Sequence, residues 1–325
     1  MFIAILVTAV TFDFLNGFHD SSNIVATVIS SRALHPRVAL VLAAIAEFLG
    51  PFLFGVAVAR TIGNELLTDQ ALTELVVLAA LLAAVLWNLI TWYLGMPSSS
   101  SHALLGGLLG AAILYTQTLT VVRVDGLIKV VLALLLSPVA GLIMGFLVMR
   151  ITLWIVRNAS PRVSTVFRRM QVLTLVGLAL SHGTNDAQKT MGVLTLTLFL
   201  TGRIATFYVP IWVIALSASA IALGTGFGGW RLIRTLGGKI YRIRPIHGFT
   251  SQIAGASVIL GSALFGGPVS TTQVLSSAIV GAGAAERVNK VRWTILRDMA
   301  LAWVLTIPTT AIASVLIFFL LRALL

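Results

Sequence analysis

The first apolar segment of this chain contains the polar run Asn16-Gly17-Phe18-His19-Asp20-Ser21-Ser22-Asn23. A second version of the run lies between two later apolar stretches, and it reads His182-Gly183-Thr184-Asn185-Asp186-Ala187-Gln188-Lys189. When Asp20 is aligned on Asp186, Gly17 falls on Gly183, and the Asn and His that flank the glycine change places. A repeated acid motif of this kind predicts a chain built from two similar halves.

A second motif follows each acid motif and places hydroxyl side chains directly after a proline. Its two copies are Gly95-Met96-Pro97-Ser98-Ser99-Ser100-Ser101-His102 and Gly266-Gly267-Pro268-Val269-Ser270-Thr271-Thr272-Gln273. Because both motifs recur in the same order, we expect a first repeat, a basic connector and a second repeat, with the boundaries 1–157, 158–170 and 171–325.

The composition indicates a membrane protein. Hydrophobic residues make up 58% of the 325 residues and charged residues only 10%, with a mean hydropathy of +1.02, whereas soluble chains carry roughly 25% charged residues. There is no cysteine, which excludes disulfides and sulfur-ligated metals. The formal charge of +12 comes from basic residues in short loops between apolar segments. That pattern reports membrane orientation and argues against nucleic-acid binding.

Several apolar segments reach the roughly 20 residues that a crossing needs, namely 37–59, 74–94, 127–149, 205–224, 247–266 and 299–321. Four others are interrupted, 1–31 and 171–201 by the acid motifs, and 95–116 and 266–284 by the hydroxyl motifs. Non-helical backbone inside a membrane persists only where it lines a cavity or packs in protein. We therefore expect a broken helix or a hairpin at each interruption. With one net crossing for each segment, the all-α polytopic fold has ten crossings in all.

Loop charges indicate which side each loop occupies. The loop 225–246 is placed in the cytoplasm by its basic residues Arg231, Arg234, Lys239, Arg242 and Arg244. Its counterpart 60–73 carries Glu65, Asp69 and only Arg60, so we place it outside. The two halves are then inverted repeats of each other, and both termini lie outside.

Asp20 and Asp186 are the first candidates for a functional site. A charged side chain at the bilayer centre costs roughly 2.5–3.5 kcal/mol on insertion scales, so intramembrane acids usually mark function. A helix cap is the structural alternative for one such Asp. Two acids at matching positions in inverted halves favour a functional site.

The hydroxyl motifs predict an oxyanion site. A proline followed by hydroxyl residues is typical of a helix start, where free backbone N–H groups carry a partial positive charge. Such helix starts bind anions. Simple capping and small-residue helix packing are the structural alternative, but the pair of motifs favours binding.

The two kinds of motif attract opposite charges, which indicates coupled binding of an anion with Na⁺ or H⁺. Either cations bind beside the anion, or a protonated oxyanion donates a hydrogen bond to an Asp. We expect Glu47, halfway along its crossing, to be a cation ligand or proton carrier. The role of Lys189, as a neighbour of the site or a group that reaches the surface, stays open. Asn88 is expected to pair helices, and Asp13 to be solvated near the outer surface.

The acid and hydroxyl motifs quoted above, from Asn16-Gly17-Phe18-His19-Asp20 to Ser270-Thr271-Thr272-Gln273, resemble those of the inorganic phosphate transporter (PiT) family of ion-coupled secondary carriers. Glu47-Phe48-Leu49-Gly50 is also similar to that family's second crossing. The resemblance covers nearly the whole chain. It implies symport of inorganic phosphate with Na⁺ or H⁺ by alternating access, in the cell membrane, without a cofactor and as a homodimer. One departure is Ser21-Ser22, where the family commonly has Ala after the first Asp.

The resemblance also implies which residues bind the substrate and the coupling ion. The implied phosphate ligands are Asp20, Asn23, Ser99, Ser100, Ser101, Asn185, Asp186, Ser270, Thr271 and Thr272. The implied cation ligands, where Na⁺ would bind, are Asp20, Asn23, Glu47, Asn185, Asp186 and Gln273.

Three other functions fit parts of the pattern. One is an ion-coupled carrier of another tetrahedral oxyanion such as sulfate, and a second is a passive anion channel. A third is an intramembrane hydrolase that uses a serine of 98–101 with His102 as its base. Adjacent residues on one helical turn rarely face each other productively, and the second copy has Gln273 in place of the His. The sequence therefore predicts a transporter and not an enzyme.

Overall fold

The computed structural model describes residues 1–68, 71–233 and 241–324, and every regular element in these ranges is a helix. Six helices are long and apolar enough to cross a membrane, namely α1 (Phe2–Ser30), α2 (Pro36–Phe54), α4 (Glu74–Leu94), α6 (Val124–Ile155), α7 (Val163–Leu200) and α12 (Trp293–Leu324). The other elements are α3 (Ala57–Arg60), a π-helical turn (Thr61–Glu65), α5 (Ser100–Thr116), α8 (Ile211–Phe227), α10 (Pro245–Leu264), α11 (Thr271–Glu286) and a 3-10 turn (Val288–Lys290). The predicted all-α integral membrane protein is confirmed.

The acid motifs lie inside continuous helices, so the predicted interruption of segments 1–31 and 171–201 is wrong. Helix α1 runs through Asp20 and α7 runs through Asp186 without a break. The polar side chains are accommodated within the helix itself. The hydroxyls of Ser21 and Ser22, for example, donate to carbonyl oxygens three residues earlier, at 2.8 and 3.0 Å. Ser and Thr side chains that bond to the preceding turn in this way are compatible with an unbroken membrane helix.

The hydroxyl motifs do interrupt the helices. Helix α4 ends at Leu94 and is followed by Gly95 in the left-handed region (φ 69°), and α5 begins at Ser100 after Pro97. In the second half, α10 ends at Leu264, Gly266 has φ 72°, and α11 begins at Thr271 after Pro268. Two predicted helix starts, one in each half, are thereby confirmed.

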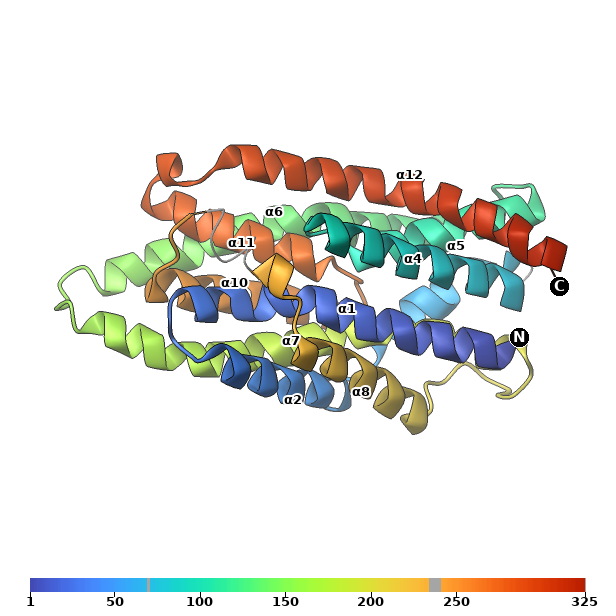
Figure 1. Ribbon diagram of the computed structural model, residues 1–325, viewed down its shortest axis with the longest axis horizontal. Coiled ribbons are helices and arrows are strands. Elements are labelled where there is room, and N and C mark those ends of the chain that lie inside the picture. Colours follow the sequence, from blue (N-terminus) through green and yellow to red (C-terminus); the bar gives the residue numbers. More distant parts are fainter. Residues whose placement is uncertain (69–70, 234–240, 325) are drawn as a thin grey trace.

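Helices α4 and α5 form a hairpin (Figure 1). The backbone N–H of Thr68, just before α4, donates to the carbonyl of Val121, just after α5, over 2.9 Å. The outer ends of the hairpin therefore lie together, and its turn, which contains the hydroxyl motif, points into the middle of the molecule.

Helices from the two halves of the chain pack against each other. Helix α1 packs on α8 and α7 packs on α2, while α5 packs on α12 and α6 on α11. Helices α1 and α7, which carry the acid motifs, are also in direct contact. The packing brings the acid motifs together at the centre of the helix bundle.

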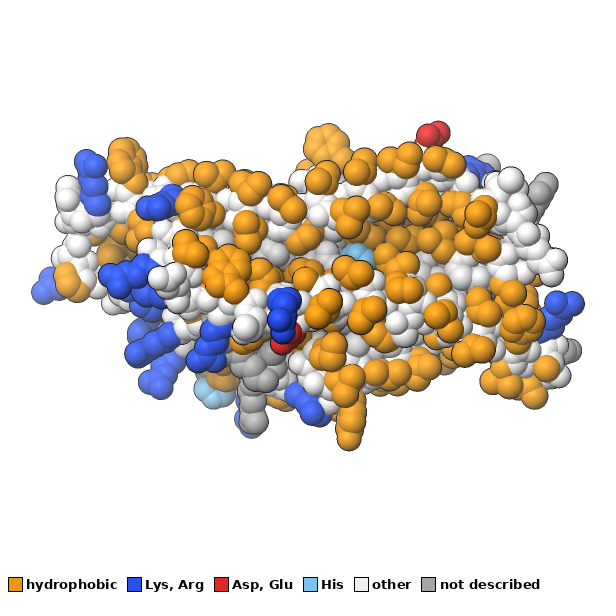
Figure 2. Space-filling view, turned by 90° about the horizontal axis from the view of Figure 1, so that it is seen from above, with side chains coloured by type: hydrophobic (Ala, Val, Ile, Leu, Met, Phe, Trp, Pro, Cys, Tyr) orange, Lys and Arg blue, Asp and Glu red, His pale blue; other side chains and the backbone are white. Residues whose placement is uncertain are grey.

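The surface is apolar along the sides of the bundle, and its basic residues gather toward one end (Figure 2). Both termini lie at the opposite end (Figure 1). Three residues used in the loop-charge argument, Asp69, Arg234 and Lys239, lie outside the described residues. The described surface thus has one basic end and one end that carries the termini.

Candidate functional site

Asp20 of α1 and Asp186 of α7 are joined by one hydroxyl group. Thr271, the first residue of α11, has its Oγ1 atom 3.2 Å from Asp20 Oδ2 and 3.2 Å from Asp186 Oδ2. All three side chains are buried. The first acid motif, the second acid motif and the second hydroxyl motif therefore meet at one point.

Asp20 accepts several further hydrogen bonds. At its Oδ1 atom, Asn23 Nδ2 donates over 2.9 Å and the Thr272 hydroxyl over 2.9 Å. His19 Nδ1 lies 3.0 Å from the same oxygen, and Asn23 Nδ2 also contacts Thr272 Oγ1 at 3.0 Å. Amide and hydroxyl donors such as Asn23 and Thr272 stabilise a buried carboxylate without cancelling its charge.

Asp186 has a different set of partners. Asn16 Nδ2 donates to its Oδ2 atom over 3.1 Å, and Lys189 Nζ donates to its Oδ1 atom over 2.6 Å. Lys189 is fully buried, so its amino group stays beside Asp186 and does not reach the surface. This contact settles the placement of Lys189 that the sequence left open.

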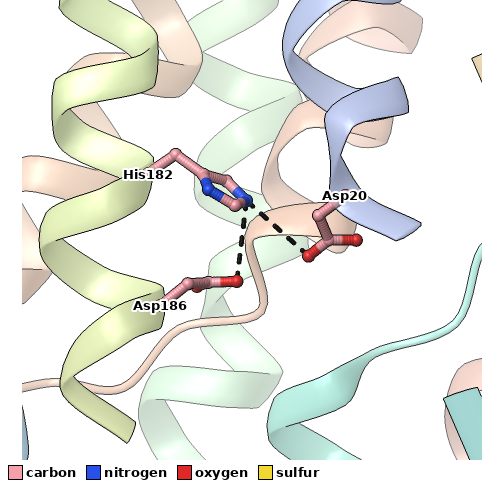
Figure 3. A group of neighbouring side chains, drawn as sticks. All are labelled: Asp20, His182 and Asp186. Atoms are coloured by element: carbon pink, nitrogen blue, oxygen red, sulfur yellow. Dashed lines mark ion pairs between the residues drawn. The ribbon is translucent and has the colours of Figure 1, made fainter. Parts of the chain in front are cut away.

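His182 lies between the two acids (Figure 3). Its Nε2 atom is 3.6 Å from Asp20 Oδ2 and 3.5 Å from Asp186 Oδ2. Its Nδ1 atom is 2.6 Å from Glu47 Oε1, a contact at ion-pair distance without hydrogen-bond alignment. Sequence reasoning gave His182 no role, although the exchange of Asn16 and His182 around the motif glycine marked both positions as special.

The site presents the atoms that a cation needs. Ligand atoms of Asp20, His182 and Asp186 all lie within 4.8 Å of one another. Three buried amide oxygens, Oδ1 of Asn16, Asn23 and Asn185, accept no hydrogen bond from the described residues. Buried polar atoms are rarely left without a partner, and carboxylate and amide oxygens are the ligands of hard cations. The residues present therefore fit a bound cation such as Na⁺.

The two hydroxyl motifs also meet. The Ser101 hydroxyl donates to the carbonyl of Val269 over 3.0 Å, which joins the start of α5 to the residues before α11. Asn185 Nδ2 contacts the carbonyl of Gly267 at 3.3 Å. A cavity of about 20 Å³ beside Ser101 and Lys189 is large enough for about one water molecule. The helix starts thus face the acid motifs directly.

Some of the predicted site residues have local structural roles here. Ser99 and Ser270 cap α5 and α11, and accept hydrogen bonds from the backbone N–H groups of His102 and Gln273. Ser100 is buried at the same helix start. Glu47 reaches the cluster through His182, whereas the bond found for Gln273 involves its backbone.

The expectation that Asp13 is solvated is wrong. Asp13 is fully buried, and accepts a hydrogen bond of 2.5 Å from Thr190, because α1 packs against α7 at this level. His102 does face a motif serine, since its Nδ1 atom is 2.7 Å from Ser99 Oγ. In the described structure no carboxylate contacts His102, and Ser99 already caps α5, so this pair lacks the third group that orients a catalytic base.

Comparison with known proteins finds relatives that are named as transporters. A family model described as "Phosphate transporter family" matches residues 16–314. A protein from Bacillus subtilis (strain 168) is 43% identical over 325 residues, covering 98% of this chain and 97% of the relative. A protein from Rhizobium meliloti (strain 1021) is 42% identical over 321 residues, covering 98% and 96%. Both are named "Probable low-affinity inorganic phosphate transporter". The relatives are thus named as transporters and not as enzymes.

A solved structure titled "The sodium-dependent phosphate transporter" has the same fold. It superposes with a TM-score of 0.89, covers 100% of this chain and 99% of its own, and is 24% identical in sequence. At that identity the likeness concerns the fold, including the arrangement of helices that brings the two acid motifs together.

Proposed function

The chain belongs to the phosphate transporter family, and from this premise we propose that it imports inorganic phosphate by symport with a cation, Na⁺ or H⁺, through alternating access. One observation carries the proposal. The hydroxyl of Thr271, at the start of α11, contacts the carboxylates of both acid motifs. Anion-binding groups and cation-binding groups therefore share one buried position near the middle of the bundle.

The helix starts supply what a phosphate ion needs. The first turns of α5 and α11 offer backbone N–H groups and the hydroxyls of Ser100, Ser101, Thr271 and Thr272. Thr271 and Thr272 now donate to the carboxylates, and each can turn its hydroxyl toward a phosphate oxygen instead. A protonated phosphate oxygen can in turn donate to Asp20 or Asp186.

The amide oxygens favour Na⁺ as the coupling ion. Oδ1 atoms of Asn16, Asn23 and Asn185 are buried without a donor in the described structure, and such oxygens coordinate metal cations. A cation bound beside Asp20 and Asp186 offsets the repulsion between these acids and a phosphate ion. Proton coupling remains the second form of the proposal, because His182 adjoins the same carboxylates and Glu47 contacts His182.

Two inverted halves, 1–157 and 171–325 joined by 158–170, provide the basis for alternating access. The helix contacts support this, because a contact between a helix of the first half and one of the second half recurs between their counterparts in the opposite halves. Helix α1 packs on α8 as α7 packs on α2. The close glycine contacts follow the same exchange, with Gly17 on Ile221 and Gly183 on Glu47, and with Gly224 on Phe14 and Gly50 on Leu180.

Orientation follows from charge. The basic end of the bundle (Figure 2) belongs in the cytoplasm by the positive-inside rule, which leaves both termini outside the cell membrane. The ten net crossings and the homodimer stay predictions.

Uptake of labelled phosphate into proteoliposomes tests the function, with Na⁺ and proton gradients imposed separately. We expect accumulation under at least one gradient and none without a gradient. Accumulation that ignores both gradients would support a passive channel instead. Unlabelled sulfate should compete poorly, and the relatives, which are named for phosphate, give the sulfate alternative no support.

A further inference from the structure

Lys189 occupies the position in the second acid motif that Asn23 occupies in the first. Both follow the motif acid by three residues in the same helix, and both donate to the Oδ1 atom of that acid. Asn23 Nδ2 is 2.9 Å from Asp20, and Lys189 Nζ is 2.6 Å from Asp186. The two halves therefore present the same contact with different chemistry.

The difference matters for a cation. An amide has an acceptor oxygen as well as its donor, whereas an ammonium group has donors only. The Asn23 oxygen is buried and accepts no bond from the described residues, so it is available as a ligand. Lys189 removes that ligand from the second half and adds a positive charge beside the acid. A free cation at Asp186 would meet the positive charge of Lys189, and it would lack the amide oxygen that Asn23 supplies at the corresponding position of the first half.

The lysine is held in this position by its surroundings. Its side chain is fully buried and borders a small cavity formed mainly by apolar residues of α5 and α6, among them Leu104, Leu108 and Leu134. An ammonium group in such surroundings cannot leave its carboxylate without a large loss of electrostatic energy. The amino group therefore stays beside Asp186.

We propose that Lys189 is a tethered cation that replaces a free coupling ion at Asp186. The second half then contributes a positive charge without carrying an ion, and the free Na⁺ binds on the side of Asp20 and Asn23. Each transport cycle therefore moves one cation fewer than in a protein whose two halves both bind a free cation. This inference rests on the proposed function and specifies its coupling.

Binding of labelled Na⁺ to the purified full chain in detergent, without phosphate, tests the proposal. Lys189→Asn restores the amide of the first half and removes the charge, so we expect one additional Na⁺ for each chain at saturation. Lys189→Met removes the charge but supplies no oxygen, and we expect it to gain no ion. An unchanged Na⁺ count in a folded Lys189→Asn protein overturns the proposal.

The reciprocal variant guards against a folding defect. Asn23→Lys places an ammonium beside Asp20, and we expect it to bind one Na⁺ fewer than the wild type; an equal count also overturns the proposal. In proteoliposomes, the reversal potential of Lys189→Asn should show one more cation moved for each phosphate. The binding assay does not depend on transport, so an unchanged Na⁺ count would contradict the role of Lys189 without contradicting the proposed function. Failure of the wild type to accumulate phosphate under either gradient would instead remove the proposed function.

Discussion

His182 Nδ1 on α7 lies 2.6 Å from Glu47 Oε1 on α2, and both side chains are completely buried. The same imidazole contacts Asp20 and Asp186 through its other nitrogen. Glu47 thus connects to both acid motifs through one ring, although it lies in neither motif. A substitution at Glu47 should therefore change the position of the His182 ring relative to both carboxylates.

Replacing Glu47 with Gln tests this connection. Leaving one member of a buried polar contact without its partner costs about 1–3 kcal/mol, and we expect a loss near the lower value because Asp20 and Asp186 still face His182. Thermal unfolding in detergent measures the loss. In a double-mutant cycle with His182→Gln, the two changes should couple by about 0.5–3 kcal/mol. Strict additivity would mean that the contact is incidental.

Asp20→Asn and Asp186→Asn should each abolish gradient-driven phosphate uptake. Both substitutions keep the shape of the side chain. Asp20→Asn removes a charge that the site needs to bind a cation, and Asp186→Asn removes the carboxylate that pairs with the buried Lys189. Asp298→Asn is a suitable control, because its side chain is 66% exposed and, within the described part of the chain, pairs only with Arg297 at 3.5 Å. Gel filtration should show that all three proteins are folded. Uptake at the wild-type level by either site variant would contradict the assignment of that acid to the transport site.

Thr271→Val removes the hydroxyl that joins the two carboxylates. Hydrogen bonds to charged groups contribute about 1.5–3 kcal/mol, so we expect the KM for phosphate to rise about 10- to 100-fold. Thr197→Val is the matched control, because the hydroxyl of this buried threonine on α7 donates to a carbonyl of its own helix, at 2.9 Å, and to no other described residue. An equal effect of both substitutions would indicate a packing role for Thr271.

The sequence was sufficient to predict the membrane class and the meeting of the acid and hydroxyl motifs. Both predictions depend on features that are visible in the sequence itself, namely its polarity, its repeated motifs and the position of its prolines. The sequence wrongly predicted a break in the helices at Asp20 and Asp186. The polar side chains of these helices find their partners on other helices and in the preceding turn, and those partners cannot be seen in the sequence. His182 and Asp13 were misjudged for the same reason, since their partners lie on α2 and α7.

Low pH should lower the stability of the folded protein through Glu286, which lies at the end of α11 near the basic end of the bundle. Burial raises the pKa of this carboxyl, but bonds with Lys290 and His247 and the charge of Arg244 outweigh burial and hold the pKa at about 2, below its ordinary value of 4.5. The stabilisation is complete above pH 4.5 and is lost as the pH falls toward 2. The unfolding temperature of the wild type should fall across this window. Glu286→Gln should lower it at neutral pH and flatten its dependence on pH, and an unchanged slope would contradict the assignment.

Gly17 and Gly183 let the two acid helices approach their partners closely. A side chain at Gly17 would collide with the carbonyl of Ile221 on α8, and one at Gly183 with the carbonyl of Glu47 on α2. Overpacking a tight contact costs about 1–3 kcal/mol, so Gly17→Ala and Gly183→Ala should each lower the unfolding temperature and slow phosphate uptake. Gly177→Ala on α7 is the control, because among the described residues no atom beyond the local helix backbone lies within 4 Å of its added methyl group, and alanine should stabilise that helix by about 0.5–1 kcal/mol. Because the two contacts correspond in the exchanged halves, the two site variants should lose stability to a similar extent. A large effect at one glycine and none at the other would contradict the proposed inverted repeat.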